Sequence, residues 1–541
     1  MRRFNSYGPI DTDLHYYVPR KALIDNAYNQ LIGENPQKGG HYITVWAPRQ
    51  TGKTWVMQEV IEKIDQTGQY DIAIITLDRA KNEIDEKEIV SIFIEKLQIA
   101  FSKQLPSLQK ISEIPSLFTA SYFQKPIILM LDEFDALEEK WISRFAGIFR
   151  DMFISRTNER KKNSKEKYYL LHGLALIGVR SVLGIENEKG SPFNVQRSVH
   201  IPNLTHEEVE GMFKWYEQES SQSIEPAVIG KIYQETAGQP GLTCWLGETL
   251  TEGVENHPND TSQPIQLEDF ENLYRLAINV LPNNNILNII SKAKIPPYKY
   301  TIIDLFKTDK PMKFRFDDKD LNYLYMNGVI EPETITGGDS YVKFASPFVQ
   351  KRLFNYFSGE IFKEMGQLVD SFYNVKEVIF RDHMDIRGIL NLYQIYLDKN
   401  KGWLFKDAPR RSDLRIYEAV FHFNLYAYLD ELLRNKKVRI FPEFPTGNGK
   451  IDLLLQYNNM TCGIELKSFT DQAGYRVALA QAAQYANRLG LREIYLVSFI
   501  ESIDDVNKKK YETPFQDNGT GVAVYPVFIQ TGKIEERQNC P

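Results

Sequence analysis

The sequence predicts an α/β protein of several domains, in which an N-terminal parallel sheet is followed by a winged-helix or helical region and a second α/β unit. Two observations predict this class. Over the first 250 residues, short segments rich in Ile, Leu and Val alternate with longer helical patterns, which is typical of a sheet covered by helices on both faces. From about residue 412 the order helix, strands, helix, strand begins again. The chain has 541 residues, which suffices for three or four domains of about 150 residues each.

The elements of the first part follow from this alternation. Strands are predicted at residues 41–46, 70–77, 126–131 and 171–179, and helices at residues 53–65 and 87–101. A basic, polar segment at residues 160–167 separates two of these elements, and we interpret it as a solvated loop rather than a binding site.

Composition limits the classes of function. The net charge is −6, so no positive field of the whole molecule attracts nucleic acid, and any such binding must come from local patches. The three cysteines show no CxxC spacing, which argues against a disulfide framework or a cysteine zinc site and favours a reducing compartment. The first residues do not resemble a signal peptide, and the longest apolar runs are too short to span a bilayer. We therefore expect a cytoplasmic protein without a membrane partner.

The later elements divide the chain further. A polar segment at residues 256–264 marks a boundary, after which helices, a helix at 318–327 and strands at 329–334 and 340–344 form a winged-helix pattern. The candidate recognition helix begins with Asp317 and Asp318, and this acidic start is the wrong sign for phosphate contact, so a structural or regulatory lid is expected. The predicted parts are residues 1–255, 265–360 (winged-helix-like), 361–411 (helical linker) and 412–541.

The first candidate site is a loop between a predicted strand and a predicted helix. The phosphate loop, as we call it here, consists of Ala47, Pro48, Arg49, Gln50, Thr51, Gly52, Lys53 and Thr54. Such a loop offers backbone N–H groups to phosphates, and the helix start adds partial positive charge. Lys53 is predicted to reach the outer phosphates, and the Thr54 hydroxyl to bind Mg²⁺. Taken alone, Gly52-Lys53-Thr54 is equally a turn that enters a helix.

A second motif completes this site. The buried strand at residues 127–131 ends in Asp132 and Glu133. Asp132 is predicted to bind the magnesium ion, directly or through water, and Glu133 to orient and deprotonate the attacking water. The two motifs each follow the C-terminal end of a buried strand, and together they predict ATP binding.

These motifs resemble the AAA-like P-loop ATPases of bacteria, which are related to the STAND NTPases, over roughly residues 8–250. The phosphate loop starts with alanine, as is frequent in this family, and Leu131-Asp132-Glu133-Phe134-Asp135 matches the second motif. The resemblance implies that Arg180 is a sensor of the γ-phosphate and that Gly238-Gln239-Pro240 is the lid motif. A helix-breaking turn is an equally good interpretation of Gly-Gln-Pro.

The second candidate site lies on a predicted hairpin at residues 450–467. With Asn458-Asn459 as a two-residue turn, facing residues have numbers that sum to 917, so Asp452 faces Glu465. Facing Cβ atoms lie about 4.5–5.5 Å apart, and a divalent cation between the two carboxylates turns their repulsion into attraction. Lys467 shares the face of Glu465 by the strand period and is predicted to orient water or stabilise charge on phosphorus.

The pattern of Asp452 on one strand and Glu465-x-Lys467 on the next resembles the PD-(D/E)xK nuclease superfamily. The resemblance covers roughly residues 413–500. The resemblance implies that Glu418, on a predicted helix at 413–433, is an additional metal ligand. It also implies that Gln481 and Tyr485 form the QxxxY motif of RecB-like members, in contact with substrate or supporting the site. The proline that precedes the first acid in this superfamily is replaced by Ile451.

The combined interpretation is an ATP-binding and ATP-hydrolysing switch that controls a nuclease dependent on Mg²⁺, or alternatively Mn²⁺. DNA is the expected substrate rather than RNA, a homo-oligomer is one expected assembly, and such fusions suit bacterial defence. Two alternatives stay open. One is a nucleotide-switched signalling or scaffold protein whose nuclease-like domain only binds, and the other is an ATP-driven remodelling or translocating enzyme.

Overall fold

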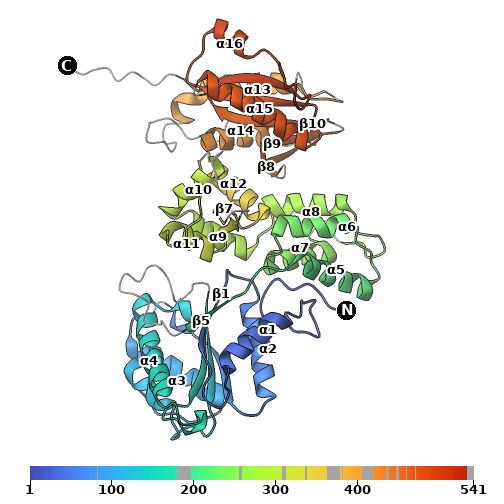
Figure 1. The fold of residues 1–541 in the computed structure, drawn as a ribbon. Helices are drawn as coiled ribbons and strands as arrows, with labels where there is room; N and C mark the ends of the chain where they lie inside the picture. Colours follow the sequence, from blue (N-terminus) through green and yellow to red (C-terminus); the bar gives the residue numbers. More distant parts are fainter. Residues whose placement is uncertain are drawn as a thin grey trace, which may run out of the picture. The chain divides into compact units, whose positions relative to one another are not determined.

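A computed structural model describes most of the chain, and its elements are shown in Figure 1. The described residues are 1–81, 83–178, 196–254, 259–307, 312–334, 338–361, 378–380, 382–404, 418–433, 438–445, 450–458, 460–469 and 471–532. The chain divides into two compact units, one of residues 1–299 and 311–349 and the other of residues 300–310 and 350–541. Two of the three unit boundaries fall inside helices α10 (Tyr298–Lys307) and α12 (Pro347–Ile361), within the predicted winged-helix region.

The first unit contains a five-stranded, fully parallel sheet. Its strand order is β2 (Asp71–Thr76), β3 (Ile127–Asp132), β4 (Leu171–Gly178), β1 (Tyr42–Trp46) and β5 (Gln196–His200). The sequence predicts four of these strands. It misses β5, whose residues Gln-Arg-Ser-Val-His are mostly polar and which lies at the edge, paired to β1 alone.

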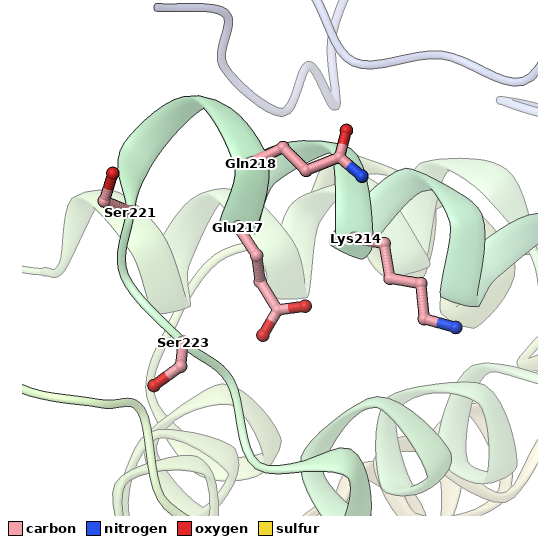
Figure 2. A pocket seen from close by; sticks show the side chains of 5 residues that line it. All are labelled: Lys214, Glu217, Gln218, Ser221 and Ser223. Carbon is pink, nitrogen blue, oxygen red and sulfur yellow. The ribbon is translucent and has the colours of Figure 1, made fainter.

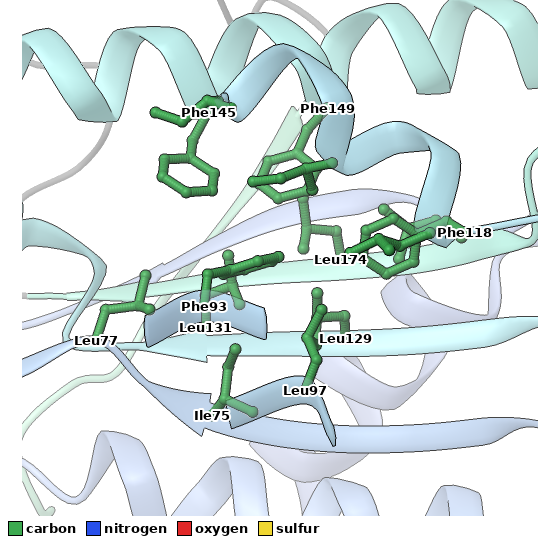
Figure 3. Close-up of a cluster of buried hydrophobic side chains, with 14 of the residues drawn as sticks. Ile75, Leu77, Phe93, Leu97, Phe118, Leu129, Leu131, Phe145, Phe149 and Leu174 are labelled. Atoms are coloured by element: carbon green, nitrogen blue, oxygen red, sulfur yellow. The ribbon is translucent and has the colours of Figure 1, made fainter. Parts of the chain in front are cut away.

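Helices cover both faces of this sheet, and the three central strands β3, β4 and β1 are buried along their whole length. On β3, Leu129 and Leu131 join a core with α3 (Glu86–Phe101) and α4 (Glu139–Asn158), shown in Figure 3. Ile128 and Met130 join the core on the other face, with α1 (Lys21–Ile32) and α2 (Lys53–Asp65). Short 3₁₀ helices at Asp78–Ala80, Ile111–Leu117, Phe134–Ala136 and Ser164–Glu166 connect these elements.

The rest of the first unit is mainly helical. The helices α5 (His206–Ser220), α6 (Pro226–Thr236), α7 (Pro240–Glu252) and α8 (Leu267–Asn279) are followed by α9 (Asn284–Ala293) and α11 (Lys319–Met326). The predicted wing is an antiparallel pair, β6 (Ile330–Thr334) and β7 (Ser340–Phe344). The acidic start of α11 is a helix cap, because the Asp318 carboxylate accepts the N–H groups of Asp320 and Leu321.

The second unit is built on a mixed, six-stranded sheet. The order is β12 (Phe515–Gln516), β13 (Ala523–Gln530), β11 (Glu493–Ile500), β10 (Met460–Ser468), β9 (Lys450–Tyr457) and β8 (Arg439–Pro445). Its helices are α13 (Ile386–Leu404), α14 (Glu418–Leu433), α15 (Gln472–Arg488) and α16 (Asp505–Tyr511). Strand β10 runs parallel to β11 and antiparallel to β9, so the predicted hairpin is embedded in the sheet.

No helix in the described part of the chain is both long enough and apolar enough to cross a membrane.

Candidate functional sites

The phosphate loop connects the end of β1 to the first turn of α2. Gly52 has φ +86° directly before the helix, a left-handed conformation that glycine adopts without strain. Gln50 is also left-handed, with φ +57°, which is uncommon for a residue with a side chain. The Thr51 hydroxyl donates to the main-chain oxygen of Pro48 at 2.9 Å and closes the loop on itself.

The two motifs predicted to bind MgATP meet in the structure. The Thr54 hydroxyl donates to the Asp132 carboxylate at 2.7 Å, which joins the start of α2 to the end of β3. Lys53 donates to the main-chain oxygens of Ala47 and Pro48 at 3.0 and 2.8 Å. Burial lowers the pKa of Lys53, and the carboxylates of Asp135, Glu133 and Asp132 act in the opposite direction.

Glu133 lies at the solvent-exposed turn that follows β3. Its backbone is left-handed, with φ +52°, and its N–H donates to the Asp132 carboxylate at 2.9 Å. Desolvation raises the pKa of Glu133, and the negative charges of Asp135 and Asp132 raise it further. A carboxyl with a raised pKa is better suited to accept a proton near neutral pH than an ordinary glutamate.

Asp135 belongs to this site, although no prediction from the sequence gives it a role. A β-carbon on Gly178 would lie 2.5 Å from the Asp135 Oδ1, so the carboxylate sits against the end of β4. Among the carboxylates near Lys53, Asp135 acts most strongly on its pKa. The sequence feature that could have identified Asp135 as a site residue is its position as the third acid of Asp132-Glu133-Phe134-Asp135. Arg180, the predicted sensor, lies outside the described residues.

The Gly-Gln-Pro segment is both a turn and a contact to the phosphate loop. Gly238 has φ +68°, and a β-carbon there would overlap the main-chain oxygen of Leu204 at 2.0 Å. The Gln239 amide donates to the main-chain oxygens of Arg49 and Gln50 at 3.0 and 3.2 Å. Its oxygen accepts the N–H of Leu242 at 2.5 Å and so caps α7.

The wing region also reaches the nucleotide site within the first unit. A β-carbon on Gly328, which follows α11, would lie 2.9 Å from the Pro48 side chain. The Tyr325 and Trp46 rings pack edge to face with centroids 5.8 Å apart. The end of α11 therefore lies against the start of the phosphate loop.

The second candidate site is on β9 and β10, and its register is the one that the sequence predicts. Tyr457 pairs with Met460 and Leu453 with Ile464, so facing residues sum to 917, as expected for the turn at Asn458 and Asn459. Asn458 has φ +50°, and Asn459 lies outside the described residues. The paired register ends at Leu453 and Ile464, one residue before Asp452 and Glu465, whose facing arrangement stays a prediction.

The predicted acids gather around residues 465–468 of β10. The Asp452 carboxylate accepts the N–H of Leu466 at 2.7 Å, and the Glu418 carboxylate accepts the N–H of Ser468 at 2.5 Å. Lys467 pairs with Glu465 at 3.2 Å, and the glutamate is 2% exposed. Asp452 therefore contacts β10 through the backbone of Leu466, which lies between Glu465 and Lys467.

His422 supports this site without joining it. Its Nε2 donates to the main-chain oxygen of Asp452 at 2.9 Å, and its ring packs on Phe354 with centroids 4.6 Å apart.

Gln481 and Tyr485 share helix α15, as predicted. Both are half-buried, and the Tyr485 ring packs against the core beneath the helix, with the Arg488 guanidinium over it at 5.7 Å. Their role as substrate contacts stays a prediction. Among the residues that the structure describes, no group of three or more His, Cys, Asp or Glu side chains has the spacing of a metal site. A metal site here would rest on two carboxylates.

A pocket of about 350 Å³ lies beside α5 (Figure 2). It is lined by Lys214, Glu217, Gln218, Ser221 and Ser223. The Glu217 carboxylate accepts the N–H of Ile224 at 2.7 Å, and none of these residues belongs to either candidate site.

Comparisons with known proteins bear on the first unit. A family model described as an AAA-like domain matches residues 5–246. The Walker-type ATPase PABY2304 of Pyrococcus abyssi is similar at 13% identity and a TM-score of 0.42, covering 65% of this chain and 99% of its own. The ORC1 protein of Aeropyrum pernix, in complex with DNA, is similar at 14% identity and a TM-score of 0.32, covering 62% and 92%. A variant of the RuvB protein of Thermotoga maritima is similar at 12% and 0.32, covering 60% and 92%.

A search of curated proteins found no match. The matched residues contain the phosphate loop, the Asp132 strand and the Gln239 turn, and they carry the five-stranded parallel sheet. The N-terminal part of the chain, residues 5–246, is an AAA-like P-loop ATPase domain.

Proposed function

We propose that the first unit binds MgATP and hydrolyses it. The observation that carries this proposal is the 2.7 Å hydrogen bond from the Thr54 hydroxyl to Asp132, because these are the two groups that hold magnesium in P-loop enzymes. A hydroxyl and a carboxylate at this distance from each other can both ligate one hard cation.

Each group in the nucleotide site has a distinct role. The N–H groups at the start of α2 bind the phosphates, and Lys53 exchanges its bonds to Ala47 and Pro48 for bonds to phosphate oxygens. Magnesium, when bound, neutralises charge on the phosphates. Glu133 positions a water and accepts its proton, which its raised pKa favours.

ATP turnover by the full chain tests this proposal. Asp132→Asn keeps the size of the side chain and removes the charge, so we expect ATP hydrolysis to fall at least a hundredfold. Lys63→Ala, at the exposed end of the same helix α2, serves as the control and should leave turnover unchanged. Equal turnover by Asp132→Asn and the parent would contradict the assignment.

We further propose that the second unit cleaves phosphodiester bonds, with DNA as the expected substrate. What supports this is the convergence of Asp452, Glu418 and the Glu465–Lys467 pair on four residues of β10. Asp452 and Glu465 would hold Mg²⁺ or Mn²⁺, and Lys467 would orient water or stabilise charge on phosphorus. Glu418, the additional ligand that the resemblance implies, accepts the N–H of Ser468 and does not form a group of three with them among the described residues.

Nucleotide state is proposed to control this cleavage. Gly328, which follows α11, lies against Pro48 of the phosphate loop, and Tyr325 of α11 packs on the neighbouring Trp46. In this proposal a change in the loop acts on the segment of the chain that leads into the second unit. The rival function is a nucleotide-switched scaffold whose second unit binds without cutting.

A cleavage assay distinguishes the nuclease from the scaffold. Linear and circular DNA are incubated with the protein and Mg²⁺ or Mn²⁺, with and without ATP. We expect cutting by the parent and none by Asp452→Ala. Cutting that survives Asp452→Ala would remove the site assignment, and DNA binding without any cutting would favour the scaffold. DNA-stimulated ATP turnover without cleavage would instead favour a translocating enzyme.

A further inference from the structure

Two buried cations lie near the N-terminal end of strand β4. The phosphate loop lies at the other, C-terminal end of the parallel strands. Arg156, in the last turn of α4, is 4% exposed, and Lys167 is 8% exposed. We call them the cation pair. Burial, together with the positive charge of Arg156, lowers the pKa of Lys167 to about 8, although the carboxylate of Glu159 acts in the opposite direction. The sequence interpretation of residues 160–167 as a solvated loop is wrong for Lys167, because the fold buries it.

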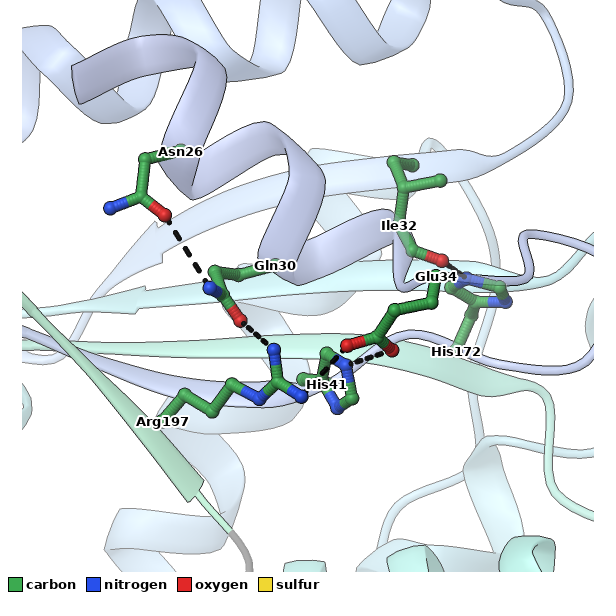
Figure 4. Close-up of polar contacts among 7 residues, drawn as sticks. All are labelled: Asn26, Gln30, Ile32, Glu34, His41, His172 and Arg197. Carbon is green, nitrogen blue, oxygen red and sulfur yellow. Dashed lines mark hydrogen bonds and ion pairs between the residues drawn. The ribbon is translucent and has the colours of Figure 1, made fainter. Parts of the chain in front are cut away.

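Arg156 is held rigidly by a chain of hydrogen bonds. Its guanidinium donates to the main-chain oxygen of Tyr169 and, at 2.6 Å, to the Ser164 hydroxyl. Ser164 lies 2.7 Å from His172 Nδ1, and His172 Nε2 lies 3.0 Å from the main-chain oxygen of Ile32 (Figure 4). Burial lowers the pKa of His172 to about 3, so the ring is neutral. Its Nε2–H therefore donates to Ile32, and Nδ1 accepts from Ser164.

No carboxylate of the described chain forms an ion pair with Arg156 or Lys167. The acid closest in the chain, Glu159, is engaged by Lys162 at 2.5 Å and by the N–H of Tyr168 at 2.8 Å. A third positive charge, Lys38, acts on Lys167 as well. Buried charges in proteins are normally paired, so two adjacent cations call for an anion.

Glu34, an exposed acid on the neighbouring loop, also bonds to other residues than the cation pair. Glu34 bonds to His41 at 2.7 Å and to Arg197 at 2.8 Å, as Figure 4 shows. Its own backbone N–H and these two partners lower the pKa of Glu34 to about 2. Glu34 is therefore ionised and turned toward His41 and Arg197.

Both cations lie beside Gly39. A β-carbon on Gly39 would lie 3.7 Å from Arg156 Nη2 and 3.9 Å from Lys167 Nζ, which are the nearest atoms outside Gly39 and its chain neighbours. The loop that carries Gly39 is fixed on both sides, since Ser164 donates to the main-chain oxygen of Gln37 at 2.7 Å and Gly40 donates to that of His172 at 3.1 Å. The position is thus bounded by two cationic groups on a fixed backbone.

We propose that the cation pair binds a small oxyanion of the phosphate class, as free phosphate or as a phosphate monoester, at a site separate from the nucleotide site. A guanidinium and an ammonium together offer charge-assisted hydrogen bonds to several oxygens of one tetrahedral anion. Glu159 acts on both cations through space but forms an ion pair with neither, so the anion would supply the directly bonded counter-charge.

Phosphate titration of the full chain tests the site. All variants carry Lys53→Ala, which weakens phosphate binding at the phosphate loop, and binding is followed by calorimetry and by the midpoint of thermal unfolding. We expect phosphate to bind and to raise the midpoint. Lys167→Met should weaken the affinity at least tenfold, whereas Lys165→Met, at an exposed lysine two residues away, should leave it unchanged.

A second variant distinguishes loss of the phosphate site from loss of the folded structure. Lys167→Glu places a carboxylate beside Arg156, so it should raise the unfolding midpoint without phosphate and abolish the response to phosphate. A monoester such as glycerol phosphate and a short DNA duplex distinguish the sources. Binding of phosphate or the monoester supports the proposal. Binding of the duplex alone, no binding of any ligand, or an equal phosphate response in Lys167→Met and Lys165→Met would overturn it.

Discussion

The side-chain amide of Gln239 donates to the main-chain oxygen of Gln50 at 3.2 Å, and this bond joins the start of helix α7 to the phosphate loop. The N–H of Gly241 donates to the same oxygen at 2.9 Å. Two donors from one helix start therefore hold the carbonyl of a loop residue whose backbone is left-handed. We therefore expect any shift of the loop on nucleotide binding to move the start of α7.

Gly241→Ala tests this junction. A β-carbon on Gly241 would lie 2.5 Å from the Gln50 β-carbon, so we expect the helix start to be displaced and the unfolding free energy to drop by about 1–3 kcal/mol. The Michaelis constant for ATP should rise as well. Gly211→Ala is the matched control, because it lies in α5 with no neighbour within 4 Å, and it should be neutral or slightly stabilising.

Glu133→Gln should separate ATP binding from turnover. We expect nucleotide binding to be retained and hydrolysis to fall by about 10²–10⁴, because the base is removed while its size is kept. Since the pKa of Glu133 is raised, the parent rate should already decline on acidification at a pH above that of an ordinary glutamate. Rates measured from pH 5 to 8 check this. Glu139→Gln, at an exposed acid of α4, should keep the parent profile.

The Glu465–Lys467 pair can be tested by stability and cleavage together. Lys467→Met leaves the buried Glu465 carboxylate without this cation, so we expect a loss of about 3–5 kcal/mol in chemical unfolding and loss of DNA cutting. Adding Glu465→Gln should restore much of the stability and none of the cutting. A double variant as unstable as Lys467→Met alone would argue against direct coupling of the two side chains.

His172 should give the first unit a characteristic acid sensitivity. Its folded pKa of about 3 is below the ordinary value near 6.5, so the unfolded chain binds a proton first as the pH falls. The stability that neutral His172 contributes is complete above pH 6.5 and declines between pH 6.5 and about 3, by on the order of 4 kcal/mol. His172→Leu should be less stable at pH 7.5 and less pH-dependent over that window. Parallel curves for the two proteins would contradict this.

Much of the fold is readable from the sequence where local pattern and tertiary packing agree. Helix α2 begins and ends where predicted, because a left-handed glycine precedes it and one apolar face packs on the sheet. The hairpin register follows from the turn alone, since a two-residue turn determines which residues face each other.

The rest depends on contacts between distant segments. Strand β5 is polar and becomes a strand only by pairing with β1. Lys167 looks like part of a solvated basic segment, and it is buried because the loop at residues 33–40 folds against it. The contacts of Gln239 to the phosphate loop join residues about 190 positions apart, and no local pattern encodes them.

The left-handed backbone of Glu133 sets a limit on how stable this protein can become. A glycine there would relieve about 1 kcal/mol of steric cost and tighten the turn after β3, while deleting the carboxylate. A substitution chosen for thermal stability alone would therefore remove the carboxylate at this position. Under the proposed function, a glycine at this position would thus exchange ATP turnover for a small gain in stability.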